Sequence, residues 1–296
     1  MICTVTLRRC YLNEILPLWR NQSGNIYVGV IMNENIVKGI QEQVQKIKKE
    51  YDIVNEIIRD DVFSILQGLD NCNVLYYPLE GDDIGGCHIE KMVNGKLEQF
   101  VFINTAKPRE KQAFVAAHEL GHIWRVDEKL RECLPNEEFE CEEVVNRFAA
   151  ELLMPEERFI TVLNSYLERI GYKGPKIAQE ELVKLIAYLM NYFFVPYMAV
   201  LYRFNELGRL NERYNDSMRR YKDSDALKDV IKTEQYTRLG IITMLKSLDN
   251  LQEYLDQAEE QGFISPTKAA AIRADFEIPR DKDDDDSEET IDFQEQ

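Results

Sequence analysis

Residues 118–122 read His-Glu-Leu-Gly-His, and this stretch decides how the rest of the chain is interpreted. On a helix, positions i and i+4 share one face, so His118 and His122 can point at a single metal ion. Glu119 lies one position further round, where its carboxylate can reach a water beside that ion. This H-E-x-x-H arrangement is typical of zinc hydrolases, with two histidine ligands and a glutamate as general base. The chain has only three histidines, and two of them lie here.

The residues around this stretch predict a helix. Pro108 suits a first helical position, and Glu110 places a carboxylate in the first turn, where the helix dipole favours it. A buried stripe is expected from apolar and small residues at helical spacing, namely Phe114, Ala117, Gly121 and Trp124. Glycine inside a helix costs about 1 kcal/mol relative to alanine, so Gly121 indicates the close approach of another helix or of a substrate.

A catalytic zinc site needs a third protein ligand, and a second predicted helix offers one at residues 142–155. Glu142 and Asn146 share a face at i and i+4, so the first suits a ligand and the second suits a hydrogen bond that orients a ligating histidine. Glu143 is the alternative ligand. Glu151 lies half a turn out of phase with Glu142 and is expected to face away.

Two segments together resemble the ImmA/IrrE metallopeptidases, a gluzincin-like branch of the zincins. They read FVFINTAKPREKQAFVAAHELGHIW at 100–124 and EEVVNRFAAELLMP at 142–155. The resemblance runs from about residue 73 to 155, with a weaker match at 193–208. It implies zinc on His118, His122 and Glu142, with Glu119 as the general base. Val145 departs from the alanine that is common in the family, which is a tolerable exchange on a packed face.

The resemblance also implies a bacterial, cytoplasmic endopeptidase that inactivates helix-turn-helix repressors of mobile elements or stress loci. The residues themselves support only metal-assisted hydrolysis, so the substrate rests on resemblance alone. Two alternatives stay open. The first alternative is an interaction protein that sequesters a repressor without cleaving it, and the second is a hydrolase of small amides. The residue that would stabilise the oxyanion is not evident, and its candidates are Tyr166, Tyr172, Tyr197 and Tyr202. The third histidine, His88, is expected to be a partly exposed strand residue.

Composition narrows the class of protein further. The formal net charge is −17, of which residues 281–296 carry −8 through nine acids and one lysine. We expect that tail to be disordered, and the acidic remainder argues against direct binding of nucleic acid. The six cysteines show no C-x-x-C spacing, so free thiols in a reducing cytosol are expected. No signal peptide is evident, and the apolar run 185–202, interrupted by Pro196, predicts two core helices in place of a membrane span.

The predicted fold class is α+β, a zincin-like core with a small sheet beside the active helix, followed by a mostly helical C-terminal region. Five regions are expected, namely an uncertain extension at 1–31, a helical segment at 32–72, the catalytic core at 73–160, the helical region at 161–278 and the acidic tail at 279–296. Translation starting at Met32 is one hypothesis. Strands are predicted at 74–77, 86–93 and 100–104, with Asn94-Gly95 as a hairpin turn. An extended substrate is expected to pair with the edge of this sheet at residues 86–89. Helices are predicted at 155–170, 176–194, 196–221, 224–247, 247–261 and 265–275.

Overall fold

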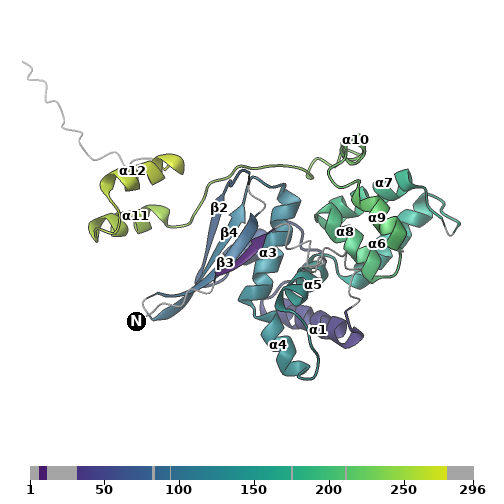
Figure 1. Cartoon of the computed structure of the whole chain (residues 1–296), viewed down its shortest axis with the longest axis horizontal. Helices are drawn as coiled ribbons and strands as arrows, with labels where there is room; N and C mark the ends of the chain where they lie inside the picture. The colour runs from purple at the N-terminus through teal and green to yellow at the C-terminus, as the bar shows by residue number, and fades with distance from the viewer. Residues whose placement is uncertain are drawn as a thin grey trace, which may run out of the picture. The chain divides into compact units, whose positions relative to one another are not determined.

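The computed structural model describes residues 7–11, 32–81, 84–93, 95–174, 176–210 and 212–278. The chain divides into two compact units, residues 1–247 and 248–296. The first unit holds the sheet and helices α1 to α10, and the second holds α11 (Leu251–Glu260) and α12 (Pro266–Asp275) (Figure 1). The acidic tail and all of 1–31 except Leu7–Tyr11 lie outside the described residues, so the hypothesis of a start at Met32 and the five expected regions stay predictions.

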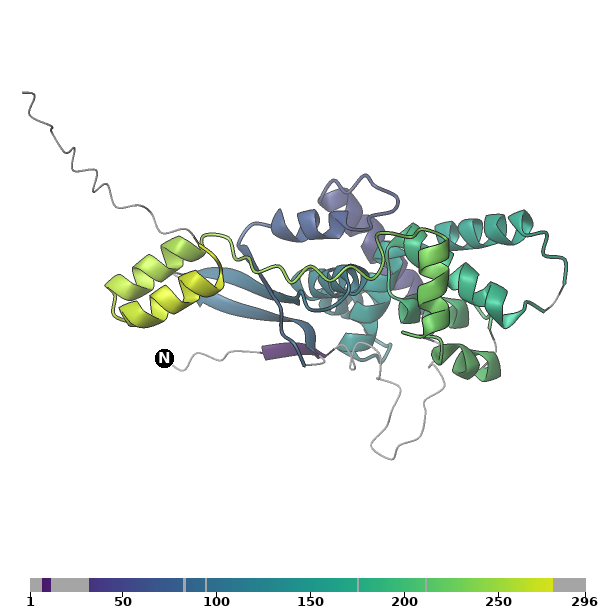
Figure 2. The same ribbon diagram turned by 90° about the horizontal axis from the view of Figure 1, so that it is seen from above.

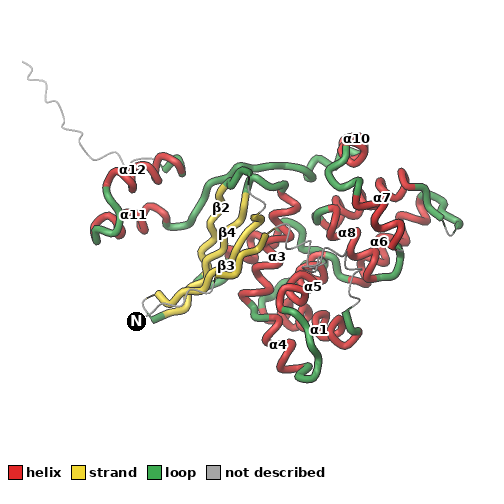
Figure 3. The backbone as a smooth tube through the Cα atoms, in the orientation of Figure 1, coloured by secondary structure: helices red, strands yellow, loops and turns green. Residues whose placement is uncertain are grey.

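A four-stranded sheet forms one layer of the first unit, and its strands are ordered β1-β3-β4-β2 (Figure 3). Its members are β1 (Leu7–Tyr11), β2 (Cys72–Tyr77), β3 (Ile84–Val93) and β4 (Lys96–Asn104). β3 is antiparallel to both β1 and β4, and β2 is parallel to β4. The predicted hairpin is confirmed, because Val93 pairs with Lys96 across a two-residue turn in which Gly95 has φ of 79°. Only glycine adopts such a φ without strain.

Helix α3 (Arg109–Ile123) lies between the sheet and helix α5 (Cys141–Leu153) (Figure 1). It is buried almost all round from Gln112 to His122, which is more than the single stripe predicted from the sequence. Pro108 was predicted to be the first helical residue, but its ψ of 143° is not helical, and it is the N-cap of α3. The expectation for Gly121 is confirmed, since a Cβ there would lie 2.8 Å from Val145 Cγ1 and 3.0 Å from the Phe148 ring on α5.

Further helices surround this core. In chain order they are α1 (Glu34–Glu50), α2 (Asp61–Gln67), α4 (Val126–Cys133), α6 (Glu156–Arg169), α7 (Gln179–Phe193), α8 (Tyr197–Glu206), α9 (Glu212–Arg219) and α10 (Asp225–Thr233). The predicted helix at 196–221 is divided into α8, which ends at Glu206, and α9, and Gly208 between them has φ of 60°. The α+β fold class is therefore confirmed, with a small sheet beside α3 and a mostly helical remainder.

The predicted helix at 224–247 is wrong beyond Thr233. Residues 240–247 form an extended segment, which Figure 2 shows as a long connection leading away from α10. Its backbone is fixed to the core, because Arg109 N–H donates to Ile241 O at 2.7 Å and Ser247 pairs with Tyr76 at 2.8 and 2.9 Å. Gln235, just after the end of α10, has φ of 56° and so leaves the helical path, and the β-branched residues that follow Gly240 favour extended backbone.

Among the described residues, no single helix combines the length and apolar composition that a membrane span requires. Helices α7 and α8 meet that requirement only as a pair, and the pair is bent by 105°. The prediction of two core helices meeting at Pro196 is confirmed, since both are largely buried.

Candidate metal centre

Helix α3 brings the two histidines of the H-E-x-x-H stretch together. His118 Nε2 and His122 Nε2 are 3.0 Å apart, and both side chains are buried. The i, i+4 spacing places both rings on the face of α3 that meets α5. Two electron-pair donors therefore converge on one point, as the sequence predicted.

Glu142, the second residue of α5, completes the group. Its carboxylate oxygens lie 3.3 Å from His118 Nε2 and 3.4 Å from His122 Nε2. Within the described part of the chain, these three residues form a cluster whose donor atoms all lie within 4.8 Å of one another. The competing glutamates are placed elsewhere, because Glu143 is outside this cluster and Glu151 pairs with Arg203.

The three donor atoms fit a tetrahedral metal ion. Bonds of about 2.0 to 2.2 Å to nitrogen and oxygen separate tetrahedral ligands by about 3.3 to 3.5 Å. The two histidine nitrogens lie 3.0 Å apart, and one Glu142 oxygen lies 3.3 Å from His118 Nε2 while the other lies 3.4 Å from His122 Nε2, which is close to that range. Because the Glu142 side chain is 44% exposed while His118 is fully buried, the cluster is reached from the side of the carboxylate. A tetrahedral ion held by these three residues would have one further position for water or substrate.

Asn146 fixes the orientation of one histidine ring. Its Oδ1 lies 3.0 Å from His118 Nδ1, so it accepts a hydrogen bond when that nitrogen carries the proton. This tautomer leaves the lone pair of Nε2 directed at the cluster, as metal ligation requires. Asn146 therefore lies within hydrogen-bonding distance of a proposed ligand, and its orienting role stays a prediction.

Opposite charge stabilises the cluster. Burial alone would raise the pKa of Glu142, but hydrogen bonds and charge interactions with His118 and His122 hold that pKa well below its usual range. Burial alone would lower the pKa of His118, but Glu142 and the nearby Glu119 raise it. The carboxylate is therefore held ionised, which is the form that binds a metal.

Glu119 lies on the face of α3 that meets β3. It is completely buried, and a Cβ added to Gly86 of β3 would lie 3.5 Å from its Oε1. The same Cβ would be 2.5 Å from Phe102 O, so only glycine fits at this point of the strand. The close approach of β3 places a strand backbone directly beside the carboxylate expected to act as the general base.

His88 is nearer to the site than predicted. It is 3% exposed, not partly exposed, and its ring stacks at 6.3 Å from that of His122. Its Nε2 hydrogen-bonds Gln99 Oε1 on β4. The period-two alternation of β3 puts His88 on the same face as Gly86, and this signal was available in the sequence. The site therefore includes all three histidines of the chain.

No oxyanion donor is assigned among the candidate tyrosines. The Tyr197 hydroxyl donates to Met218 O at 2.9 Å, and the Tyr166 ring packs on Tyr188 at 4.9 Å. Tyr202 contacts Arg219 through its ring, and Tyr172 follows α6 in a loop. Tyr166, Tyr197 and Tyr202 therefore contact residues of the C-terminal helical region.

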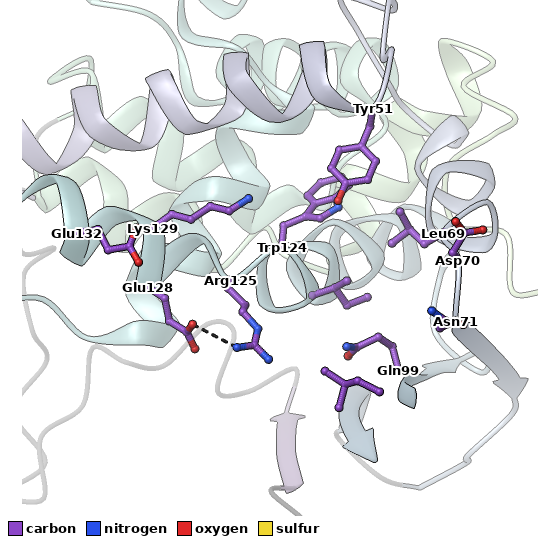
Figure 4. Close-up of a pocket in the computed structure, with 12 residues that line it drawn as sticks. Tyr51, Leu69, Asp70, Asn71, Gln99, Trp124, Arg125, Glu128, Lys129 and Glu132 are labelled. Carbon is purple, nitrogen blue, oxygen red and sulfur yellow. Dashed lines mark hydrogen bonds and ion pairs between the residues drawn. The ribbon is translucent and has the colours of Figure 1, made fainter. Parts of the chain in front are cut away.

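A separate cavity of about 620 Å³ lies at the carboxyl end of α3 (Figure 4). Tyr51, Trp124 and Gln99 line it, and Arg125 there forms an ion pair with Glu128 at 3.5 Å. None of the three clustered metal-ligand candidates lines this cavity. It is therefore distinct from the metal centre, although Gln99 contacts both the cavity and His88.

Residues 71–205 match the family model of Peptidase_M78, the IrrE N-terminal-like domain. This part of the chain belongs to that metallopeptidase family, as the resemblance to ImmA/IrrE proteins predicted. The matched residues include the whole cluster, together with Glu119, Asn146 and His88. No curated protein and no solved structure matches the chain.

Proposed function

We propose that this protein is a zinc-dependent endopeptidase that hydrolyses a peptide bond in a regulatory protein. The convergence of His118, His122 and Glu142 beside Glu119 carries the proposal. Structural zinc sites are usually rich in cysteine and closed, whereas a set of two histidines and one glutamate with an open position is typical of hydrolases. Four cysteines lie outside this cluster, namely Cys72, Cys87, Cys133 and Cys141.

The metal is held by His118, His122 and Glu142 in this proposal. A zinc ion bound there supplies Lewis-acid chemistry, polarising a carbonyl group and making water more acidic. Asn146 keeps the His118 ring oriented for ligation throughout.

Glu119 moves the proton in this mechanism. Its carboxylate is buried next to the cluster, and its negative charge acts on His118. It accepts a proton from the attacking water and returns it to the nitrogen of the leaving amine. Burial favours this role, because a carboxylate shielded from bulk solvent exchanges its proton with the reactants before solvent.

The sheet supports a peptide substrate over a small amide. β3 runs beside Glu119 at Gly86, and an extended peptide added along β3 would place its backbone next to the cluster. Hydrogen bonds along a strand are made to every second residue of a chain, so they favour polypeptides. A small amide would use none of them.

We further propose that the substrate is a helix-turn-helix repressor and that cleavage takes place in the cytoplasm. The support is the likeness to ImmA/IrrE proteins together with the net charge of −17, which opposes direct contact with DNA. The protein would thus alter transcription through another protein.

Co-expression with the helix-turn-helix repressor encoded nearest to the gene tests the proposal. We expect the wild-type protein to produce a discrete repressor fragment, which a mass measurement of the repressor detects. Glu119→Gln should lower the cleavage rate by about 10² to 10⁴-fold while zinc stays bound, because only the proton acceptor is lost. Glu110→Gln is the matched control, since Glu110 is another buried glutamate of α3 but binds the Gly240 N–H.

Other outcomes contradict the proposal. Repressor that stays intact but co-purifies with both the wild-type and the Glu119→Gln proteins would identify a sequestering protein. Equal cleavage by both proteins would remove Glu119 from the mechanism.

A further inference from the structure

Strand β3 borders the candidate metal centre, because Gly86 approaches Glu119 and His88 stacks on His122. β3 pairs with β4 on one side and with the N-terminal strand β1 on the other. Figure 2 shows β1, in dark purple, along the border of the sheet. Without β1, β3 would itself be an edge strand with a row of backbone donors and acceptors available for pairing.

The register places β1 opposite the two residues of β3 that face the site. Cys10 pairs with Gly86, which lies over Glu119, and Arg8 pairs with His88, which stacks on His122. The backbone of β1 therefore passes along the segment of β3 that borders both the proposed general base and a proposed ligand.

We propose that Leu7–Tyr11 occupies the edge of β3 that an extended peptide substrate uses, so that the chain's own N-terminal strand competes with substrate. This inference rests on the proposed peptidase function, and it adds the binding surface and its regulation. One edge of a strand accepts one partner, and β1 is antiparallel to β3 across the site. Substrate binding at this edge then requires that β1 leave it.

The pairing is limited enough to be reversible. β1 has five residues, and its register shifts between Cys10 and Tyr11, which ends regular pairing there. A tethered segment acts at an effective concentration on the order of millimolar, so even weak pairing keeps the edge mostly occupied. An occupied fraction of about 90% would raise the apparent KM about tenfold.

The experiment compares two double variants of the full, zinc-loaded chain. Backbone N–H groups of adjacent strand residues point to opposite sides, so Arg9→Pro with Cys10→Pro removes at least one donor directed at β3. Arg9→Ala with Cys10→Ala changes the same side chains and keeps both donors. Hydrogen exchange of the amides of residues 86–89 measures the pairing, and hydrolysis of casein measures the activity.

Among the amides of residues 86–89, we expect those that point toward β1 to exchange at least tenfold faster in the proline variant than in the alanine variant, while those paired with β4 stay protected. The proline variant should also show a KM for casein about three- to tenfold lower, with kcat unchanged. A fluorescent peptide of residues 5–13 should bind the proline variant more tightly than the alanine variant and inhibit it competitively.

Equal exchange in the two variants would overturn the proposal, because β1 would then not cover β3. A higher KM in the proline variant would also overturn it, since β1 would then serve as a platform for substrate. Faster exchange and tighter peptide binding without casein hydrolysis by any variant would support the occupied edge and contradict the peptidase function instead. The experiment therefore distinguishes failure of the proposed β1 occupancy from failure of the proposed peptidase function.

Discussion

Two glutamates of helix α5 have different partners, histidines for Glu142 and arginines for Glu151. Glu142, at its start, lies 3.3 and 3.4 Å from the histidines of α3 and is 44% exposed. Glu151, nine residues later, is 7% exposed and accepts hydrogen bonds from Arg203 at 2.6 Å and Arg147 at 3.2 Å. The same side chain therefore serves two different purposes within one helix.

The difference lies in whether the partners carry a permanent charge. Arg203 is always protonated, and it also binds Met154 O at 2.5 Å and Glu206 at 3.0 Å. The charge of Glu151 is thus fully compensated, and the cluster joins α5 to α8. His118 and His122 become lone-pair donors when they are neutral, so the group around Glu142 is suited to a cation from outside. The arginine cluster therefore joins two helices, whereas the histidine cluster presents donor atoms to a cation.

The largest expected effect is on the stability of the arginine cluster. Glu151→Gln leaves Arg203 and Arg147 buried with less compensating charge, and breaking a buried pair costs about 3 to 5 kcal/mol. We expect the free energy of unfolding measured in urea to fall by about 3 kcal/mol, the lower end of that range, because Arg203 keeps its ion pair with Glu206. The zinc stoichiometry should not change. Glu181→Gln is the control, because its pair with Lys184 is exposed and should contribute less than about 1 kcal/mol. Equal losses would contradict the structural assignment of Glu151.

Glu142→Gln should lower metal affinity, because the cluster loses its charged oxygen ligand. Loss of one of three ligands is expected to weaken zinc binding by more than the roughly 100-fold upper limit for an orienting residue. A competition titration with a chelator measures this. Glu143→Gln, one residue away, should bind zinc as the wild-type protein does. If Glu143→Gln were the weaker binder, the third ligand would be Glu143.

Asn146→Ala should weaken zinc binding by about 10- to 100-fold, because the His118 ring loses the acceptor that fixes its tautomer. Asn146→Asp keeps an acceptor oxygen at the same place and should restore most of the affinity. The same titration gives both values. If Asn146→Ala, which has no acceptor at this position, bound zinc as tightly as the wild-type protein, Asn146 would not orient the ring.

The smallest effect is the acid sensitivity contributed by Glu151. Burial would raise the pKa of this carboxyl group, but the charges of Arg203 and Arg147 lower it below its ordinary value of 4.5. A lowered folded-state pKa gives stability that is present above pH 4.5 and is lost as the pH falls below it. The slope for one group is at most about 1.4 kcal/mol per pH unit. Unfolding of Glu151→Gln should therefore depend less steeply on pH in that acidic range than unfolding of the wild-type protein.

Local patterns predicted the elements that carry the site. The spacing of His118 and His122 predicted α3, the Asn94-Gly95 turn predicted the β3–β4 hairpin, and the phase of Glu142 against Glu151 distinguished their two faces. These features depend on backbone periodicity within a few residues, so one sequence is enough to predict them. The extended path of residues 240–247 was missed, because it depends on hydrogen bonds to Thr105 and Tyr76, which are distant in sequence.

The sequence by itself determined the residue types of the candidate metal centre, namely two histidines and a neighbouring glutamate on one helix and a second glutamate on another. Only the tertiary structure decided which strand borders that centre and what lies along it. The burial of His88 against His122 and the pairing of Leu7–Tyr11 with β3 follow from the order of strands in the sheet. Periodicity reports which face a residue takes within its own element, whereas strand order is a property of contacts between elements that no local pattern records.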